Sequence, residues 1–169
     1  MTLQASTLST PLGPFTAIVD TGVVVGAGFR ATPAEQRQQL DPRRRSMPLA
    51  VVDDLGPITE ALRAYFAGEV TALDAVEVDQ PGGAFRTAAW KAMRAVPPGE
   101  TITYGELAAL AGTPGAGQAA GTACSQNRIA LVVPCHRIVR TGGGLGGYFY
   151  GLDMKRRLLA HERGEGELA

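Results

Sequence analysis

The run Pro81-Gly82-Gly83 near the middle of the chain constrains the fold most, because proline and glycine interrupt helices and strands. A chain of 169 residues is long enough for one or two small domains, each with a hydrophobic core. The apolar residues before this run and those after it also follow different spacings. We therefore expect two domains, residues 1–80 and 83–169, joined by a short linker.

The first half is expected to form a small α/β domain with an antiparallel sheet. Two short apolar runs, residues 15–19 and 23–27, flank Asp20-Thr21-Gly22, whose composition is typical of a hairpin turn. Apolar residues recur at helical spacing across residues 58–66, and Gly68 then favours the end of that helix. These patterns predict a strand hairpin followed by a helix.

A polar segment, residues 32–48, separates the hairpin from that helix and predicts a loop or an irregular helix. It contains the run Arg43-Arg44-Arg45. Runs of like charge usually lie on a solvated surface. We therefore expect the three arginines to face solvent rather than to clamp a phosphate.

The second half is expected to be mostly helical. Residues 85–96 place apolar side chains on one face of a helix. Thr103 then begins another helix, with Glu106 three residues later, which is the pattern of a capping box. Leu107 and Leu110 are expected to point inward from this second helix.

A third helix is expected over residues 116–125, after the break Gly112-Thr113-Pro114-Gly115. Two short helices joined by a glycine-containing turn predict a helix-turn-helix, whose second helix usually enters a DNA groove. This helix has small, uncharged side chains that suit close approach to the minor groove. The same composition fits a tightly packed internal helix equally well, so both interpretations stay open.

The net charge is zero over the whole chain but is divided unequally between its parts. Residues 1–82 contain six arginines against ten acidic residues, a net charge of −4, whereas residues 83–169 contain ten basic against six acidic residues, a net charge of +4. This division favours a second domain that faces nucleic acid. No apolar stretch is long enough to cross a membrane and no signal-peptide pattern is present, so we expect a cytoplasmic protein without membrane contact.

Cys135 and His136 are the candidate reactive pair, within the run Val133-Pro134-Cys135-His136-Arg137-Ile138-Val139. A thiol is a weak nucleophile until it loses its proton, and an adjacent imidazole can remove that proton. Taken alone, the pair fits a buried strand end equally well. With two cysteines and two histidines in all, the sequence predicts no disulfide framework, no metal site and no cofactor.

Several motifs in order give the chain a resemblance to the O6-alkylguanine-DNA alkyltransferases, the methylated-DNA–protein-cysteine methyltransferases. The Pro-Cys-His-Arg core at Cys135 resembles the active-site signature of that family. The likeness covers nearly the whole chain and includes Ser9-Thr10-Pro11-Leu12-Gly13-Pro14, Tyr65-Phe66-Ala67-Gly68, Phe85 through Trp90 to Pro97, Gly99-Glu100-Thr101, Tyr104-Gly105-Glu106, Gly146-Gly147-Tyr148 and Leu158-Leu159-Ala160-His161-Glu162.

The resemblance implies DNA repair by a single displacement at one thiol. Cys135 would attack the alkyl carbon on O6 of guanine, or on O4 of thymine, and the alkylated protein would be spent. His136 would act as the base through a water, and Glu162 would orient its imidazole. Asn127 would brace the turn before the active-site strand, and Tyr104 would donate to N3 of the guanine.

The resemblance also implies two sets of binding residues, because a stacked base must be flipped into a pocket before it can react. The residues expected to contact DNA or to support flipping are Gln118, Ala116, Gly117, Ala119, Gly121, Thr122, Arg128 and Arg137. The residues expected to line the guanine pocket are Pro134, Val139, Tyr148, Phe149 and Tyr150.

For the fold, the resemblance implies a ribonuclease H-like first domain and a winged-helix-like second domain. The implied partner is double-stranded DNA with alkylated bases, contacted in its minor groove by a monomer. The alternative is a non-catalytic sensor of alkylated DNA, like the alkyltransferase-like proteins. Those proteins lack the acceptor cysteine, whereas Cys135 is present here.

Three features depart from the family pattern. Gln118 stands where most members have an arginine that fills the gap left by the flipped base, so we expect weaker DNA binding or slower flipping. Arg128 replaces the usual proline and adds a cation that would lower the pKa of the Cys135 thiol or contact a phosphate, or else would point to solvent. Phe149-Tyr150 makes the closing loop bulky, which favours methyl over benzyl groups.

Overall fold

The computed structural model describes residues 1–165, which divide into two compact units. The first unit contains Met1–Gln80 together with Arg128–Val132, and the second contains Pro81–Asn127 and the described residues from Val133 onward. The main division falls directly before Pro81-Gly82-Gly83. The segment Arg128–Val132 belongs to the first unit because Ile129 forms a parallel bridge with Ala27 there, a long-range pairing that the local sequence pattern did not indicate.

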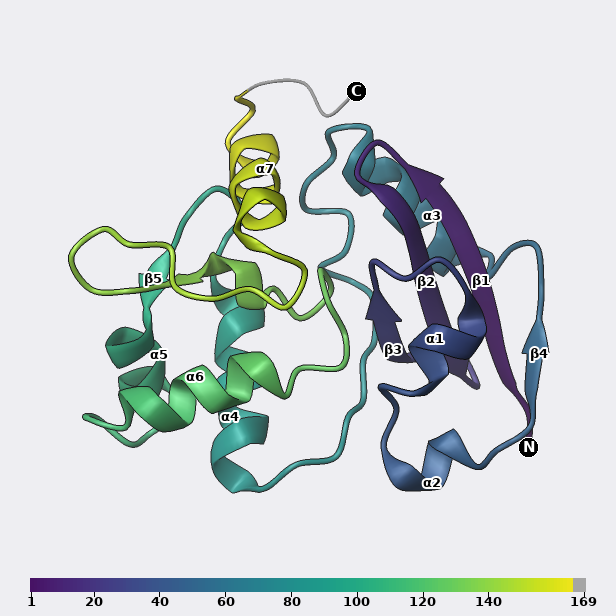
Figure 1. The fold of residues 1–169 in the computed structure, drawn as a ribbon, viewed down its shortest axis with the longest axis horizontal. Coiled ribbons are helices and arrows are strands. Elements are labelled where there is room, and N and C mark those ends of the chain that lie inside the picture. Colours follow the sequence, from purple (N-terminus) through teal and green to yellow (C-terminus); the bar gives the residue numbers. More distant parts are fainter. Residues whose placement is uncertain (166–169) are drawn as a thin grey trace. The chain divides into compact units, whose positions relative to one another are not determined.

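The first unit is built on a four-stranded sheet of β1 (Leu3–Thr10), β2 (Gly13–Asp20), β3 (Val23–Gly28) and β4 (Leu49–Val51) (Figure 1). The strand order is β3-β2-β1-β4, with β1 and β3 antiparallel to β2 and with β4 parallel to β1. The sheet is therefore mostly antiparallel, as the α/β prediction required.

The predicted hairpin at residues 15–27 is confirmed as β2 and β3. Its two-residue turn consists of Thr21 and Gly22, with φ angles of 51° and 81°. Two successive positive φ angles are characteristic of the tight turn that matches the twist of paired strands, and glycine adopts such a conformation without a steric cost. Local turn chemistry thus determines the register of this edge of the sheet.

Three helices accompany the sheet: α1 (Pro33–Arg37), α2 (Pro42–Arg45) and α3 (Pro57–Phe66). The predicted helix at residues 58–66 is confirmed by α3. The polar segment predicted as a loop or an irregular helix contains the two short helices α1 and α2. Each begins with a proline, and the side chains of Thr32 and Asp41 accept from backbone amides at their N-termini.

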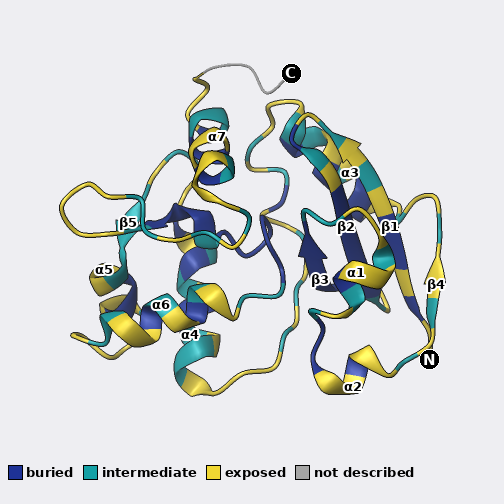
Figure 2. Ribbon diagram, viewed as in Figure 1, coloured by how far each residue is buried: buried dark blue, intermediate teal, exposed yellow. Residues whose placement is uncertain are grey.

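The core of the first unit lies along the sheet: buried and exposed positions alternate in part along β1, whereas β2 and β3 are buried at most positions (Figure 2). Its packed apolar cluster consists of Leu3, Ala5, Ile18, Val25 and Leu40. Leu40 follows α1, so the short helix is held against the sheet by an apolar contact rather than by its own length.

Arg44 contradicts the prediction that the three successive arginines face solvent. Arg43 and Arg45 are exposed, but Arg44 is 7% exposed. Its guanidinium lies 2.7 Å from Asp79 Oδ2, 3.3 Å from Asp20 Oδ2 and 3.5 Å from Asp41 Oδ2. The prediction failed because two of these carboxylates, Asp20 and Asp79, come from distant parts of the sequence.

The second unit contains four helices of two to three turns and a short parallel pair of strands. Its elements are α4 (Ala84–Ala95), β5 (Ile102–Thr103), α5 (Tyr104–Leu110), α6 (Gly117–Ser125), the 3₁₀ helix η1 (Cys135–Arg137), β6 (Ile138–Val139) and α7 (Leu152–Glu162). Of the helices in residues 1–165, none is long and apolar enough to span a membrane.

The predicted helices of the second unit are present, with one error in orientation. The capping box is confirmed, because the side chain of Thr103 accepts from the amide of Glu106 and the side chain of Glu106 accepts from the amide of Thr103. Leu107 is buried as expected. Leu110 is 65% exposed, so its predicted inward orientation is wrong. It is the last residue of α5, where the chain turns away from the core.

Helix α6 is half-buried, which excludes the interpretation of a fully internal helix. Ala120 and Ala123 are buried, and Trp90 Nε1 on α4 donates to the carbonyl of Ala123 at 2.9 Å. Gln118 and Thr122 are exposed on the opposite side. Helices α5 and α6 are joined by a short turn and pack against each other, as a helix-turn-helix requires. The finer ribonuclease H-like and winged-helix-like descriptions stay predictions.

The Arg44 cluster makes a testable contribution to stability. Replacing Arg44 with methionine leaves Asp41, which is 4% exposed, and the half-buried Asp20 without their shared cation. We expect the free energy of unfolding to fall by about 3 kcal/mol in urea denaturation, because loss of one partner leaves a buried charge uncompensated. Arg43→Met is the matched control and should change stability little. Equal effects of the two variants would contradict this assignment.

Candidate active site

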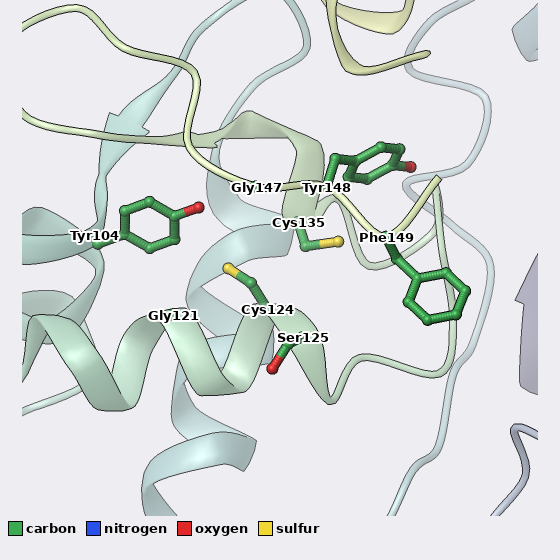
Figure 3. Close-up of a pocket in the computed structure, with 8 residues that line it drawn as sticks. All are labelled: Tyr104, Gly121, Cys124, Ser125, Cys135, Gly147, Tyr148 and Phe149. Atoms are coloured by element: carbon green, nitrogen blue, oxygen red, sulfur yellow. The ribbon is translucent and has the colours of Figure 1, made fainter. Parts of the chain in front are cut away.

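A pocket of about 290 Å³ in the second unit contains the thiol of Cys135 (Figure 3). The side chains and backbone that line it come from α5, α6, η1 and the loop before α7: Tyr104, Gly121, Cys124, Ser125, Cys135, Gly147, Tyr148 and Phe149. The thiol is partly exposed to this pocket and is therefore accessible to a ligand.

The local sequence around Cys135 fixes its position. Pro134 precedes a single turn of 3₁₀ helix, and the amide of Cys135 donates to the carbonyl of Val133 at 2.9 Å. Directly after this turn, Ile138 pairs with Ile102 in the β5–β6 ladder. The reactive residue thus sits on a short turn that is held by the parallel ladder at its C-terminal end.

His136 is fully buried and is held by a carboxylate from the far end of the unit's sequence. Its Nε2 lies 2.8 Å from Glu162 Oε2, and its ring makes an edge contact with Tyr148, a residue of the pocket wall. The other ring nitrogen, Nδ1, is buried and has no hydrogen-bond partner among residues 1–165. This nitrogen is available to accept a proton when Nε2 donates to Glu162.

Arg137, which the resemblance placed among the DNA-contacting residues, is buried within the second unit. It is 5% exposed, and its guanidinium holds the same carboxylate of Glu162 through Nε at 2.8 Å and Nη2 at 3.0 Å. Its Nη1 donates to the carbonyl of Val96 at the end of α4. The local sequence did not indicate this burial, because Glu162 lies 25 residues away in the sequence.

Glu162 is ionised despite its burial. Burial alone would raise its pKa, but the hydrogen bonds of His136 and Arg137 and the positive charge of Arg137 lower the pKa well below the usual range of a glutamate. A carboxylate that accepts three hydrogen bonds from two neighbours is an acceptor only. It therefore orients the imidazole and does not itself serve as an acid.

The thiol of Cys135 is protonated at rest. Burial raises its pKa, while a hydrogen bond from Asn127 and the positive charge of Lys155 act in the opposite direction without reversing the shift. Asn127 also donates to the carbonyl of Val133 at 2.8 Å, so it braces the turn that carries the thiol. A base near the thiol is therefore needed for nucleophilic attack.

Tyr104 faces the pocket from the first turn of α5 (Figure 3). Burial raises the pKa of its hydroxyl, which keeps it a proton donor at neutral pH. Gly146 allows this arrangement: its φ is 73°, and a Cβ atom there would lie 2.5 Å from the Tyr104 oxygen. The loop can approach the tyrosine this closely only with glycine at that position.

Lys155 is a residue of this site that sequence reasoning missed. It is fully buried, and its Nζ donates to the carbonyls of Ile138 at 2.6 Å, Leu145 at 2.5 Å and Gly147 at 3.1 Å. The ammonium group thereby ties the loop before α7 to β6. Its burial could have been inferred from helical spacing. Positions 155, 158, 159 and 162 lie on one face of α7, which also carries Leu158, Leu159 and Glu162.

The structure brings together only part of the predicted binding residues. Gly121, Tyr148 and Phe149 line the pocket, whereas Val139, Tyr150 and the buried Pro134 are not among its lining residues. Cys124 and Ser125 also line it and had not been predicted to do so. The remaining predicted contacts on α6 and its N-cap, which the pocket does not include, are Ala116, Gly117, Gln118, Ala119 and Thr122.

Two further observations concern the site's surroundings. Arg128 belongs to the first unit, where its amide donates to the side chain of Gln80 and its carbonyl accepts from Ala27. Its predicted effect on the thiol stays a prediction. In the described part of the chain, no group of three or more His, Cys, Asp or Glu side chains is arranged to hold a metal ion.

Comparison with known proteins gives a consistent result. Residues 84–164 match the family described as the 6-O-methylguanine DNA methyltransferase, DNA binding domain. A methylated-DNA–protein-cysteine methyltransferase of Mycobacterium bovis is 38% identical over 93% of this chain and 90% of its own length. One from Mycolicibacterium paratuberculosis is 51% identical over a match that spans 62% of each chain.

Solved structures agree with the sequence relatives. The chain is similar to the crystal structure of Mycobacterium tuberculosis O6-methylguanine methyltransferase, with a TM-score of 0.78, 33% identity, and coverage of 97% of this chain and 94% of that one. The chain is also similar to the crystal structure of Mycobacterium tuberculosis OGT in complex with DNA. The TM-score is 0.82 and the identity is 34%, and the match covers 97% of this chain and 95% of that one. The chain therefore belongs to the methylated-DNA–protein-cysteine methyltransferase family.

The role of Lys155 in holding the pocket loop can be measured directly. In Lys155→Met, we expect the amides of Gly146 and Gly147 to exchange hydrogen at least about tenfold faster, because a hydrogen bond to a charged group contributes about 1.5–3 kcal/mol. Arg156→Met, an exposed neighbour on α7, is the control. Unchanged exchange at both glycines would show that the loop is held by other contacts.

Proposed function

We propose that this protein repairs DNA by transferring the alkyl group from O6 of guanine to the sulfur of Cys135. The observation that carries this proposal is the placement of a pocket-exposed thiol beside a buried imidazole that Glu162 and Arg137 hold in one orientation. Such a nucleophile, base and orienting carboxylate form a unit for nucleophilic catalysis. Family membership supports the assignment of its substrate class.

In the proposed reaction, the sulfur of Cys135 attacks the alkyl carbon and the carbon–oxygen bond breaks. The electron pair leaves with the guanine oxygen, and a new carbon–sulfur bond forms. The thiol proton passes, through a water, to Nδ1 of His136, whose burial and lack of a partner among the described residues suit this role. Tyr104 donates its proton toward N3 of the purine and so stabilises the leaving group.

The product is a thioether, which is a stable and unreactive form of the side chain. We therefore infer a single turnover, in which each protein molecule accepts one alkyl group. The same displacement would serve O4-alkylthymine, because its alkyl carbon is also attached to an oxygen on a nucleobase. The pocket can hold a base only after the base has left the stack, so the reaction includes base flipping.

The inferred partner is double-stranded DNA that contains an alkylated base. A relative of this protein has been crystallised in complex with DNA. In this chain, α5 and α6 would form a winged-helix-like reading unit, and the exposed side of α6 offers Gln118, Ala119 and Thr122 to the minor groove. The absence of bulky side chains there permits close backbone approach, and a monomer is sufficient for it.

Intact mass after exposure to a methylated oligonucleotide tests this function. We expect a mass gain of one methyl group, located on Cys135 by peptide mapping, after incubation with a duplex that contains O6-methylguanine. Cys135→Ser should show no gain, and His136→Gln should react at least about a hundredfold more slowly because it lacks the base.

Binding of the duplex without any mass gain in the wild-type protein would contradict the transferase assignment. It would favour the alternative of a non-catalytic sensor of alkylated DNA. A gain located on a residue other than Cys135 would overturn the assignment of the nucleophile.

A further inference from the structure

The pocket contains a second thiol. Cys124 comes from the last turn of α6 and Cys135 from η1, and they are the only cysteines of the chain. Both are free, partly exposed and part of the same pocket lining. Figure 3 shows both side chains at the same part of the cavity, with their sulfur atoms directed to opposite sides, so a bond between them requires rotation of the side chains about their Cα–Cβ bonds.

Cys124 is on the pocket side of α6 rather than on its packing side. The packing side consists of Ala120 and Ala123, which are buried. Cys124 instead shares the pocket with Gly121 and Ser125. Gly121 has no side chain, and a Cβ atom at this position would meet no other atom within 4 Å, so this turn of α6 leaves the pocket open. Packing against α4 therefore does not account for this thiol.

The chemistry of Cys124 argues against a second alkyl acceptor. Burial raises its pKa strongly, and the nearby Cys135 raises it further, so Cys124 remains a protonated thiol. His136 lies next to Cys135 in the chain and is held by Glu162, which leaves Cys124 without a comparable base. A protonated thiol is a poor nucleophile toward an alkyl carbon. The sulfenic acid of a neighbouring cysteine is a different electrophile, with which a thiol condenses to form a disulfide.

We propose that Cys124 and Cys135 form an oxidisable dithiol site, in which Cys124 converts peroxide-oxidised Cys135 into an intramolecular disulfide. The sulfur of Cys135 attacks one oxygen of hydrogen peroxide, the oxygen–oxygen bond breaks, and a sulfenic acid and water are formed. The sulfur of Cys124 then attacks the sulfenic sulfur, the sulfur–oxygen bond breaks, and a second water leaves with the thiol proton. In total, two thiols and one peroxide give one disulfide and two waters.

Formation of the disulfide does not depend on the proposed function, but its effect on alkyl transfer rests on that function. A disulfide across the pocket occupies the sulfur that would accept the alkyl group and blocks the space for the base. It also prevents further oxidation of Cys135 to the irreversible sulfinic and sulfonic acids. A protein that can use its acceptor thiol only once would be preserved by this bond until a reductant restored it.

Peroxide treatment followed by intact mass measurement tests the dithiol site. For the wild-type protein, we expect loss of two hydrogens, a disulfide-linked peptide that joins Cys124 to Cys135, and a monomeric band on a non-reducing gel. Methyl acceptance should be lost and then restored by dithiothreitol to the rate of the untreated sample. In Cys124→Ser, the same treatment should add two or three oxygens, and dithiothreitol should not restore acceptance.

A double variant, Cys124→Ser with Gln126→Cys, provides the matched control. It keeps two thiols but moves the second to the exposed position that follows α6. We expect it to behave like Cys124→Ser. Addition of oxygens to the wild-type protein without a disulfide, or equal disulfide formation in the double variant, would overturn the proposal. Methyl acceptance before oxidation reports separately on the proposed function, since disulfide formation is measured without DNA.

Discussion

The ionised carboxylate of Glu162 is the interaction on which the site depends. It accepts hydrogen bonds from His136 and from two nitrogens of Arg137, all of them buried. Burying an isolated charge is strongly unfavourable, and three charge-assisted hydrogen bonds offset that cost here. Because Arg137 also donates to Val96, a single carboxylate joins the C-terminal end of α4 and the reactive turn η1 to α7.

Helix α7 supports the pocket in two places at once. Glu162, near its end, holds the turn that carries Cys135 and His136, while Lys155, near its start, holds the loop that carries Gly147 and Tyr148. The two side chains are seven residues apart and therefore lie on the same face of the helix. The positions of the thiol, the base and the pocket wall consequently depend on one rigid element.

The sequence predicted those features that depend on local chemistry. The hairpin at Thr21 and Gly22, the capping box at Thr103, and the helix ended before Pro97 all follow from neighbouring residues. The pairing of Cys135 with His136 was visible for the same reason.

Buried charges were not predictable in this way. Arg44 is surrounded by Asp20, Asp41 and Asp79, and Arg137 reaches a carboxylate 25 residues away, so neither burial can be read from local periodicity. The position of Glu162 was expected only through the family resemblance. The place of Cys124 in the pocket was not predicted, because the side of α6 that faces the pocket depends on how the helix docks against Trp90.

The protonation of the His136 ring tests the central claim most directly. In a two-bond ¹H–¹⁵N correlation spectrum of the ¹⁵N-labelled protein at neutral pH, this account predicts a proton on Nε2, directed at Glu162, and an unprotonated Nδ1 that is able to accept the thiol proton. A proton on Nδ1 would contradict the account, because the imidazole could not then serve as the base for Cys135.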